Sequence, residues 1–94
     1  MERSIEIKKF INDHQELFWY SPGNKSETVS DESLVETILN YGDMSTINMF
    51  FRIFGLRNAS KIFFESINKS KRRQNNYSEP TINYFTLLFN RYAQ

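Results

Sequence analysis

The chain has 94 residues, of which 39% are hydrophobic and 16% aromatic, with no cysteine and a formal net charge of +1. This length predicts one domain with one core, and the lack of cysteine excludes disulfides, thiolate metal sites and a cysteine nucleophile. The amino terminus is charged and no apolar run approaches the ~18–20 residues of a membrane span, so we expect no signal peptide, no membrane association and a cytoplasmic location.

The first apolar segment has the spacing of one helical stripe, which predicts a helix near residues 3–18. Its apolar positions are Ile7, Phe10, Ile11, Leu17 and Phe18. His14, the single histidine, falls on the same stripe, so we expect it half-buried at the core edge rather than in a metal or acid–base site. Trp19 precedes a Pro-Gly turn, and we interpret it as a lid over the core, with partner contact as the alternative. Residues 21–30 are polar and predict a loop.

The middle of the chain predicts two helices, near residues 31–41 and 44–54. Ser30 and Asp43 are the expected N-caps, and Gly42 ends the first of the two helices. The helix over 31–41 has a broad apolar face, which indicates a helix covered on more than one side. That face consists of Leu34, Val35, Ile38, Leu39 and Tyr41.

Two further helices are predicted near residues 58–69, capped by Asn58, and 79–92, capped by Ser78. The basic stretch between them is expected to be a loop. The fold prediction is therefore an all-α, compact single-domain bundle of four or five helices over residues 1–94, with an aromatic-rich core.

Catalytic, cofactor and metal sites have no local sequence signal. The three glycines are isolated at 23, 42 and 55, so no phosphate-binding loop exists, and no second histidine or cysteine can join His14 around a metal. We therefore expect no enzyme activity, no cofactor and no bound metal.

A binding surface is easier to locate, because the charge is divided along the chain. Residues 1–47 contain four Lys and Arg against nine Asp and Glu, whereas residues 48–94 contain eight against two. The basic run at 69–73, with Arg91, can neutralise phosphates while Tyr77 stacks on a base, or it can contact an acidic protein surface, or it can be a solvated segment. The candidate contacts to a partner or nucleic acid are Lys69, Lys71, Arg72, Arg73, Arg91, Tyr77 and Trp19.

Residues 34–54 can be compared with a DNA-binding helix-turn-helix motif, with Gly42 at the turn. The match is poor, because Asn48 falls where that motif usually has a buried aliphatic residue.

Three short elements resemble a known family. They are Leu17-Phe18-Trp19, the segment from Val35 to Asp43 with the pattern V-x-x-x-L-x-x-G-D, and the segment from Tyr77 to Phe85 with the pattern Y-S-x-x-T-x-N-[FY]. Together they resemble a family of small bacterial proteins of unknown function, often encoded beside a nucleotidyltransferase-like toxin. Tyr20 departs from the family, in which an acid often follows the Trp. The resemblance implies an antitoxin or accessory role and no catalytic residues.

The leading hypothesis is a non-enzymatic protein-interaction module, an antitoxin-like partner of a nucleotidyltransferase. The alternative is a small DNA-binding regulator that uses the basic run at 69–73 and the third predicted helix. The sequence leaves open the oligomeric state and the exposure of Trp19.

Overall fold

The computed structural model describes residues 4–19, 23–69 and 71–93, without the side chains of Arg72 and Arg73. Its longer helices are α1 (Ile5–Asp13), α3 (Asp31–Tyr41), α4 (Met44–Phe54), α5 (Leu56–Lys69) and α7 (Glu79–Tyr92). Its short elements are the 3₁₀ helix η1 (Gln15–Phe18), α2 (Lys25–Thr28) and α6 (Lys71–Gln74). Within these ranges the chain contains no strand, which confirms the all-α prediction.

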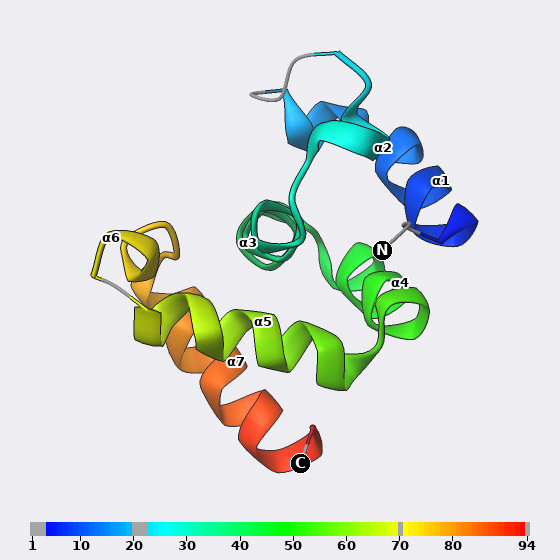
Figure 1. Cartoon of the computed structure of the whole chain (residues 1–94). Helices are drawn as coiled ribbons and strands as arrows, with labels where there is room; N and C mark the ends of the chain where they lie inside the picture. The colour runs from blue at the N-terminus through cyan, green and yellow to red at the C-terminus, as the bar shows by residue number, and fades with distance from the viewer. Residues whose placement is uncertain (1–3, 20–22, 70, 94) are drawn as a thin grey trace.

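Helix α3 lies in the middle of the molecule, with α1 and α2 on one side and α5 on the other (Figure 1). It packs against η1, α4 and α5. Its buried residues spread over a wide arc, which confirms that this helix is covered on more than one side. They are Leu34, Val35, Thr37, Ile38 and Leu39. Tyr41 departs from the prediction, because it lies in the last helical position and its side chain is exposed.

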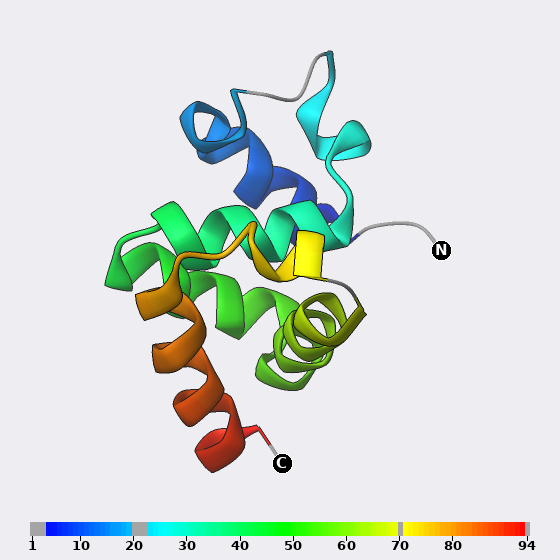
Figure 2. The same ribbon diagram turned by 90° about the vertical axis from the view of Figure 1, so that its left-hand side faces the viewer.

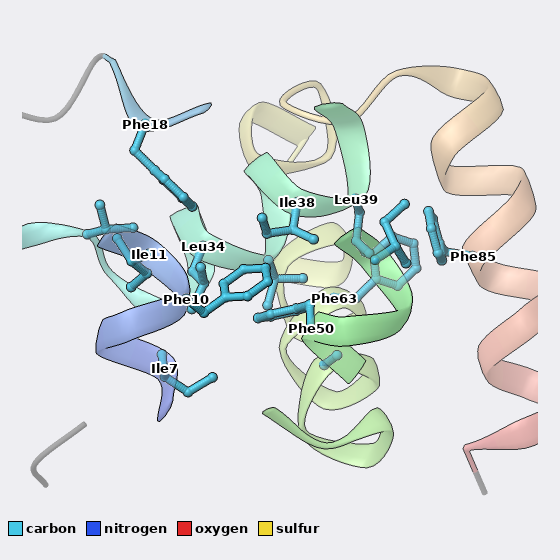
Figure 3. Close-up of a cluster of buried hydrophobic side chains, with 14 of the residues drawn as sticks. Ile7, Phe10, Ile11, Phe18, Leu34, Ile38, Leu39, Phe50, Phe63 and Phe85 are labelled. Carbon is cyan, nitrogen blue, oxygen red and sulfur yellow. The ribbon is translucent and has the colours of Figure 1, made fainter. Parts of the chain in front are cut away.

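The core between these helices is rich in aromatic rings, as predicted. Figure 3 shows Phe10 and Phe50 next to Leu34 and Ile38, with Phe63 close by. Phe10 lies 5.7 Å from Phe50, and Phe63 lies 5.3 Å from Phe89, measured between ring centroids. The rings thus connect α1 to α4, and α5 to α7.

Three helix starts have the N-caps that the sequence predicts. The side chains of Ser30, Asp43 and Ser78 each accept a hydrogen bond from the backbone N–H three residues later, at distances of 3.1, 2.8 and 3.3 Å. This satisfies donors that have no partner within the helix. The bond from the Thr46 N–H to the Asp43 carboxylate also lowers the pKa of Asp43.

The predicted helix over 3–18 is interrupted at His14, and residue 3 lies outside the described residues. His14 has φ −123° and ψ 33°, and its Nδ1 lies 2.8 Å from the carbonyl oxygen of Phe10. The imidazole thus takes the acceptor that the His14 backbone N–H would use in a continuous helix, and that N–H bonds to Ile11 instead. The chain then tightens into η1. His14 itself is half-buried, as expected.

Helix α5 begins at Leu56, two residues before the predicted start. Gly55 has φ +98°, a conformation that side chains disfavour, and it lets the chain turn directly from α4 into α5. The Asn58 amide does not cap α5, contrary to the prediction. Its Nδ2 donates to the Phe54 carbonyl at 3.0 Å and so satisfies the end of α4.

Two segments predicted as loops contain short helices. Helix α2 lies within residues 21–30, of which 21 and 22 are outside the described part of the chain. Helix α6 lies within the basic stretch, and its last backbone bond runs from the Asn75 N–H to the Lys71 carbonyl at 2.9 Å. Neither segment has the apolar spacing on which the helix predictions depend.

Asn40 ties the end of α3 to the start of α7. Its Nδ2 donates to the carbonyl of Asn76 at 2.8 Å, and its Oδ1 accepts from the N–H of Ser78 at 3.2 Å. One amide therefore satisfies two backbone groups on either side of Tyr77, which fixes the chain just before α7.

We predict that Asn40→Ala lowers the free energy of unfolding by about 1–2 kcal/mol, because both backbone groups lose their partner. The stability of Asn40→Asp should fall between that of the parent and that of Asn40→Ala, since a carboxylate accepts from Ser78 but donates nothing to Asn76. Urea unfolding followed by circular dichroism measures the difference. Asn48→Ala, at an exposed position of α4, controls for the change in helix propensity. Equal stability of the two alanine variants would contradict the role of Asn40.

Candidate partner-binding groove

Trp19 is exposed, contrary to the interpretation that it covers the core. Its side chain is 81% exposed, whereas the preceding Phe18 is fully buried at 0%. Consecutive residues of a 3₁₀ turn point about 120° apart, so η1 can direct only one of the two rings inward. Phe18 takes the inward position next to Ile11 and Leu34 (Figure 3). Phe18 therefore covers the core, and Trp19 lies on the surface.

Trp19 lies on a surface groove of about 330 Å³. The groove is formed by the end of η1, one side of α3 and the segment before α7, which runs beside α3 (Figure 2). Its lining residues are Trp19, Ser33, Glu36, Thr37, Asn40, Tyr41 and Asn76. Tyr41 is 71% exposed, so two large aromatic side chains border one hollow.

The polar residues of the groove hold one another in place. Asn76 Nδ2 donates to Glu36 Oε1 at 3.3 Å, and Asn40 bonds to the backbone on both sides of Tyr77. Among the described lining residues there is acidic, amide, hydroxyl and aromatic chemistry, but no basic side chain. Such a set suits apolar contact and hydrogen bonding with another protein better than the binding of an anion.

Two of the three sequence elements on which the resemblance rests line this groove, and the third begins next to it. Trp19 comes from the first element, while Asn40 and Tyr41 come from the second. Asn76 immediately precedes the third, and the Ser78 of that element bonds to Asn40. Segments far apart in the sequence therefore meet in one place.

Tyr77 cannot stack on a nucleic-acid base, as the sequence suggested, because only 4% of it is exposed. Its ring packs edge-on against Phe63, with centroids 5.1 Å apart. The turn after α6 sends this side chain inward, and the Tyr77 N–H bonds to the Gln74 carbonyl at 3.1 Å. The tyrosine therefore belongs to the core.

Lys69 and Lys71 do not form one surface with Arg91. Lys69 Nζ lies 3.9 Å from Glu32 Oε1, and Lys71 is exposed on α6. Ser70 and the side chains of Arg72 and Arg73 lie outside the described part of the chain. Arg91 is in the last turn of α7, the end of that helix away from α6 (Figure 1). Its guanidinium carbon lies 5.5 Å from the centroid of the Tyr92 ring.

The helix-turn-helix comparison also finds little support. Asn48 is exposed on α4 and does not occupy the buried position that the motif requires, in agreement with the poor sequence match. Arg52, on the same helix, is exposed, as are Arg57 and Lys61 on α5.

A second hollow, of about 920 Å³, lies among α1, the segment from Ser26 to Asp31 and the end of α4. Lys8 and Glu27, both on its lining, form an ion pair at 3.0 Å. Across the described ranges, no group of three or more metal-ligating side chains is placed to hold an ion, and no helix has the length and apolar character to cross a membrane.

Comparisons with protein-family models, with curated proteins and with solved structures each found no match. The family resemblance drawn from the three elements stays a prediction.

We predict that Phe18→Ala lowers the free energy of unfolding by about 3–5 kcal/mol, because it empties a buried ring position. Trp19→Ala should change it by less than about 0.5 kcal/mol, as expected for an exposed residue. Chemical denaturation of both variants measures this difference. Similar losses for the two would restore the view that Trp19 covers the core.

For the DNA-binding alternative, we expect no salt-dependent affinity for a duplex of about 20 base pairs, because Tyr77 is buried and Arg91 is distant. Fluorescence anisotropy across a salt titration measures this. A steep decrease of affinity with salt, lost when Lys69, Lys71, Arg72 and Arg73 are neutralised together, would instead establish DNA binding by the basic run.

Proposed function

We propose that this chain is a non-enzymatic protein-interaction module that binds a partner protein at the groove beside Trp19. The observation that carries the proposal is the pair of exposed aromatic side chains, Trp19 and Tyr41, on one groove. Large aromatic residues are enriched at the energetic centres of protein interfaces. Exposed apolar side chains grouped around a hollow mark an interaction site more often than scattered ones do.

The contact surface of these two rings is large enough to matter. A tryptophan and a tyrosine each bury about 150–250 Å² when covered, which gives an upper bound of about 7–13 kcal/mol for the pair at about 25 cal/mol per Å², before the entropy cost of association. The groove residues between the rings supply fixed hydrogen-bonding groups, because Asn40, Asn76 and Glu36 are already held in position. A rigid site loses less entropy when it binds.

The resemblance favours a specific partner class. Since the bacterial family that the three elements resemble is often encoded beside a nucleotidyltransferase-like toxin, we propose that the partner is such an enzyme and that the chain acts as its antitoxin or accessory protein in the bacterial cytoplasm. The position of these elements supports this choice, because two of them line the groove and the third begins beside it, where its Ser78 bonds to Asn40.

The test is reconstitution with the product of the neighbouring gene, which the proposal expects to be a nucleotidyltransferase. We expect a complex at micromolar concentration and a decrease in the toxicity of the enzyme. Trp19→Ala should weaken binding at least tenfold, which corresponds to about 1.4 kcal/mol or more, and Tyr41→Ala should weaken it less. Isothermal titration calorimetry and a growth assay measure the two effects.

A matched control is Tyr92→Ala, which removes another exposed tyrosine, 64% exposed, at the far end of α7. This variant should bind as the parent does. No complex at micromolar concentration, or equal binding by the Trp19 and Tyr92 variants, would disprove the proposal.

A further inference from the structure

Among the described residues that line the groove beside Trp19, one is acidic. This residue, Glu36, is half-buried on α3 and lines the same hollow as Trp19 and Tyr41. Its Oε1 accepts a hydrogen bond from Asn76 Nδ2 at 3.3 Å. A carboxylate accepts up to about four hydrogen bonds, so Glu36 can accept from a partner while it holds Asn76. A partner that covers the two rings therefore also covers this carboxylate.

The carboxylate decides which kind of side chain can cover the groove. An apolar segment laid over Trp19 and Tyr41 would remove water from Glu36 without replacing the hydrogen bonds that the water makes, and burying a charge in this way is costly. A basic side chain supplies both the hydrogen bonds and the opposite charge. The charge of Glu36 therefore favours a cationic occupant over an apolar one.

The charges on the neighbouring elements act in the same direction. The segments η1 and α3 contain Glu16, Asp31, Glu32 and Glu36 but no Lys or Arg. Lys69 lies 3.9 Å from Glu32, one turn of α3 before Glu36, and is not part of the groove lining. The side chains that η1 and α3 supply around the groove thus carry negative charge only, which attracts a cation.

Arginine fits this groove better than lysine does. Its planar guanidinium stacks on aromatic rings and donates two parallel hydrogen bonds to a carboxylate, whereas a lysine ammonium is a more strongly hydrated point charge. The exposed Trp19 ring supplies the stacking surface. The groove volume of about 330 Å³ is at the lower end of the range for ligand sites, which suits one long side chain.

We propose that the partner protein inserts an arginine side chain into this groove, with the guanidinium against the Trp19 ring and its N–H groups donating to the Glu36 carboxylate. This inference rests on the proposed function, because it names the group that the partner presents to the groove. Glu36 is then the residue that selects a basic segment of the partner, while Trp19 supplies the contact area.

The test uses the purified chain alone with four capped peptides, acetyl-Gly-Ser-X-Ser-Gly-amide, in which X is arginine, lysine, citrulline or leucine. The chain contains one tryptophan, so the Trp19 indole N–H gives a single nuclear magnetic resonance signal that reports on the groove. The arginine peptide should shift this signal saturably, with a dissociation constant of roughly 1–10 mM, and should bind about threefold or more tighter than the lysine peptide. The neutral citrulline and leucine peptides should cause no saturable shift.

Two matched variants test the role of the carboxylate. Glu36→Gln removes the charge but keeps an oxygen that accepts from Asn76, so it should weaken binding of the arginine peptide about threefold or more. Glu65→Gln, the same change at an exposed position of α5, should bind as the parent does. Equal binding of the leucine and arginine peptides, or of the two variants, would overturn the proposal. So would concentration-dependent shifts of the free chain that Glu36→Gln removes, because a second copy would then occupy the groove.

The same variants in the complex separate this inference from the proposed function. If Trp19→Ala weakens the complex with the neighbouring gene product and Glu36→Gln does not, the groove is the binding site and the arginine contact is wrong. If the arginine peptide binds as expected and no complex forms, the groove selects a guanidinium but the neighbouring gene product is not its partner.

Discussion

The burial of α3 on several sides is the constraint on which the rest of the structure depends. Five of its residues are buried, and they point in directions too varied for one neighbouring helix to cover. Among the described residues the buried apolar side chains form one cluster, so the other helices must be arranged around this one. The 3₁₀ helix η1 covers one side, and α4 and α5 cover another. The side that they leave uncovered carries Asn40 and borders the groove.

Helix α7 is held differently, by rings and by its start. Its buried face packs on the aromatic residues of α4 and α5, whereas its connection to α3 is the pair of hydrogen bonds from Asn40. Aromatic packing fixes the depth of the helix but leaves it free to slide along its axis, because rings tolerate several offset geometries. A bidentate amide at the start removes that freedom. The segment between α5 and α7 thus serves first as a structural connection. Asn40 and the burial of Tyr77 hold the part of it just before α7 in place.

The sequence predicted the central helices well because their signals are local. Ser30, Asp43 and Ser78 are N-caps in the prediction and in the structure, since a cap depends only on the next three residues. The misjudged residues depend on contacts with distant segments or on small changes of helical twist. Phe18 and Trp19 are adjacent and both aromatic, so only the break at His14 decides which of them faces inward. Tyr77 follows a run of basic residues, so the sequence suggests a surface position. In the structure it packs against Phe63 of α5 and is buried.

The groove shares residues with the connection that holds the start of α7, and this determines which substitutions report on binding. Asn40 and Asn76 line the groove, yet they also hold the start of α7. A loss of binding after their substitution would therefore have two explanations, a missing contact or a displaced helix. Trp19 reports on binding more directly, because its side chain lies outside the core, at the end of η1. Because Trp19 is exposed, its substitution should change the free energy of unfolding little. A loss of binding after that substitution therefore identifies the surface that the partner covers.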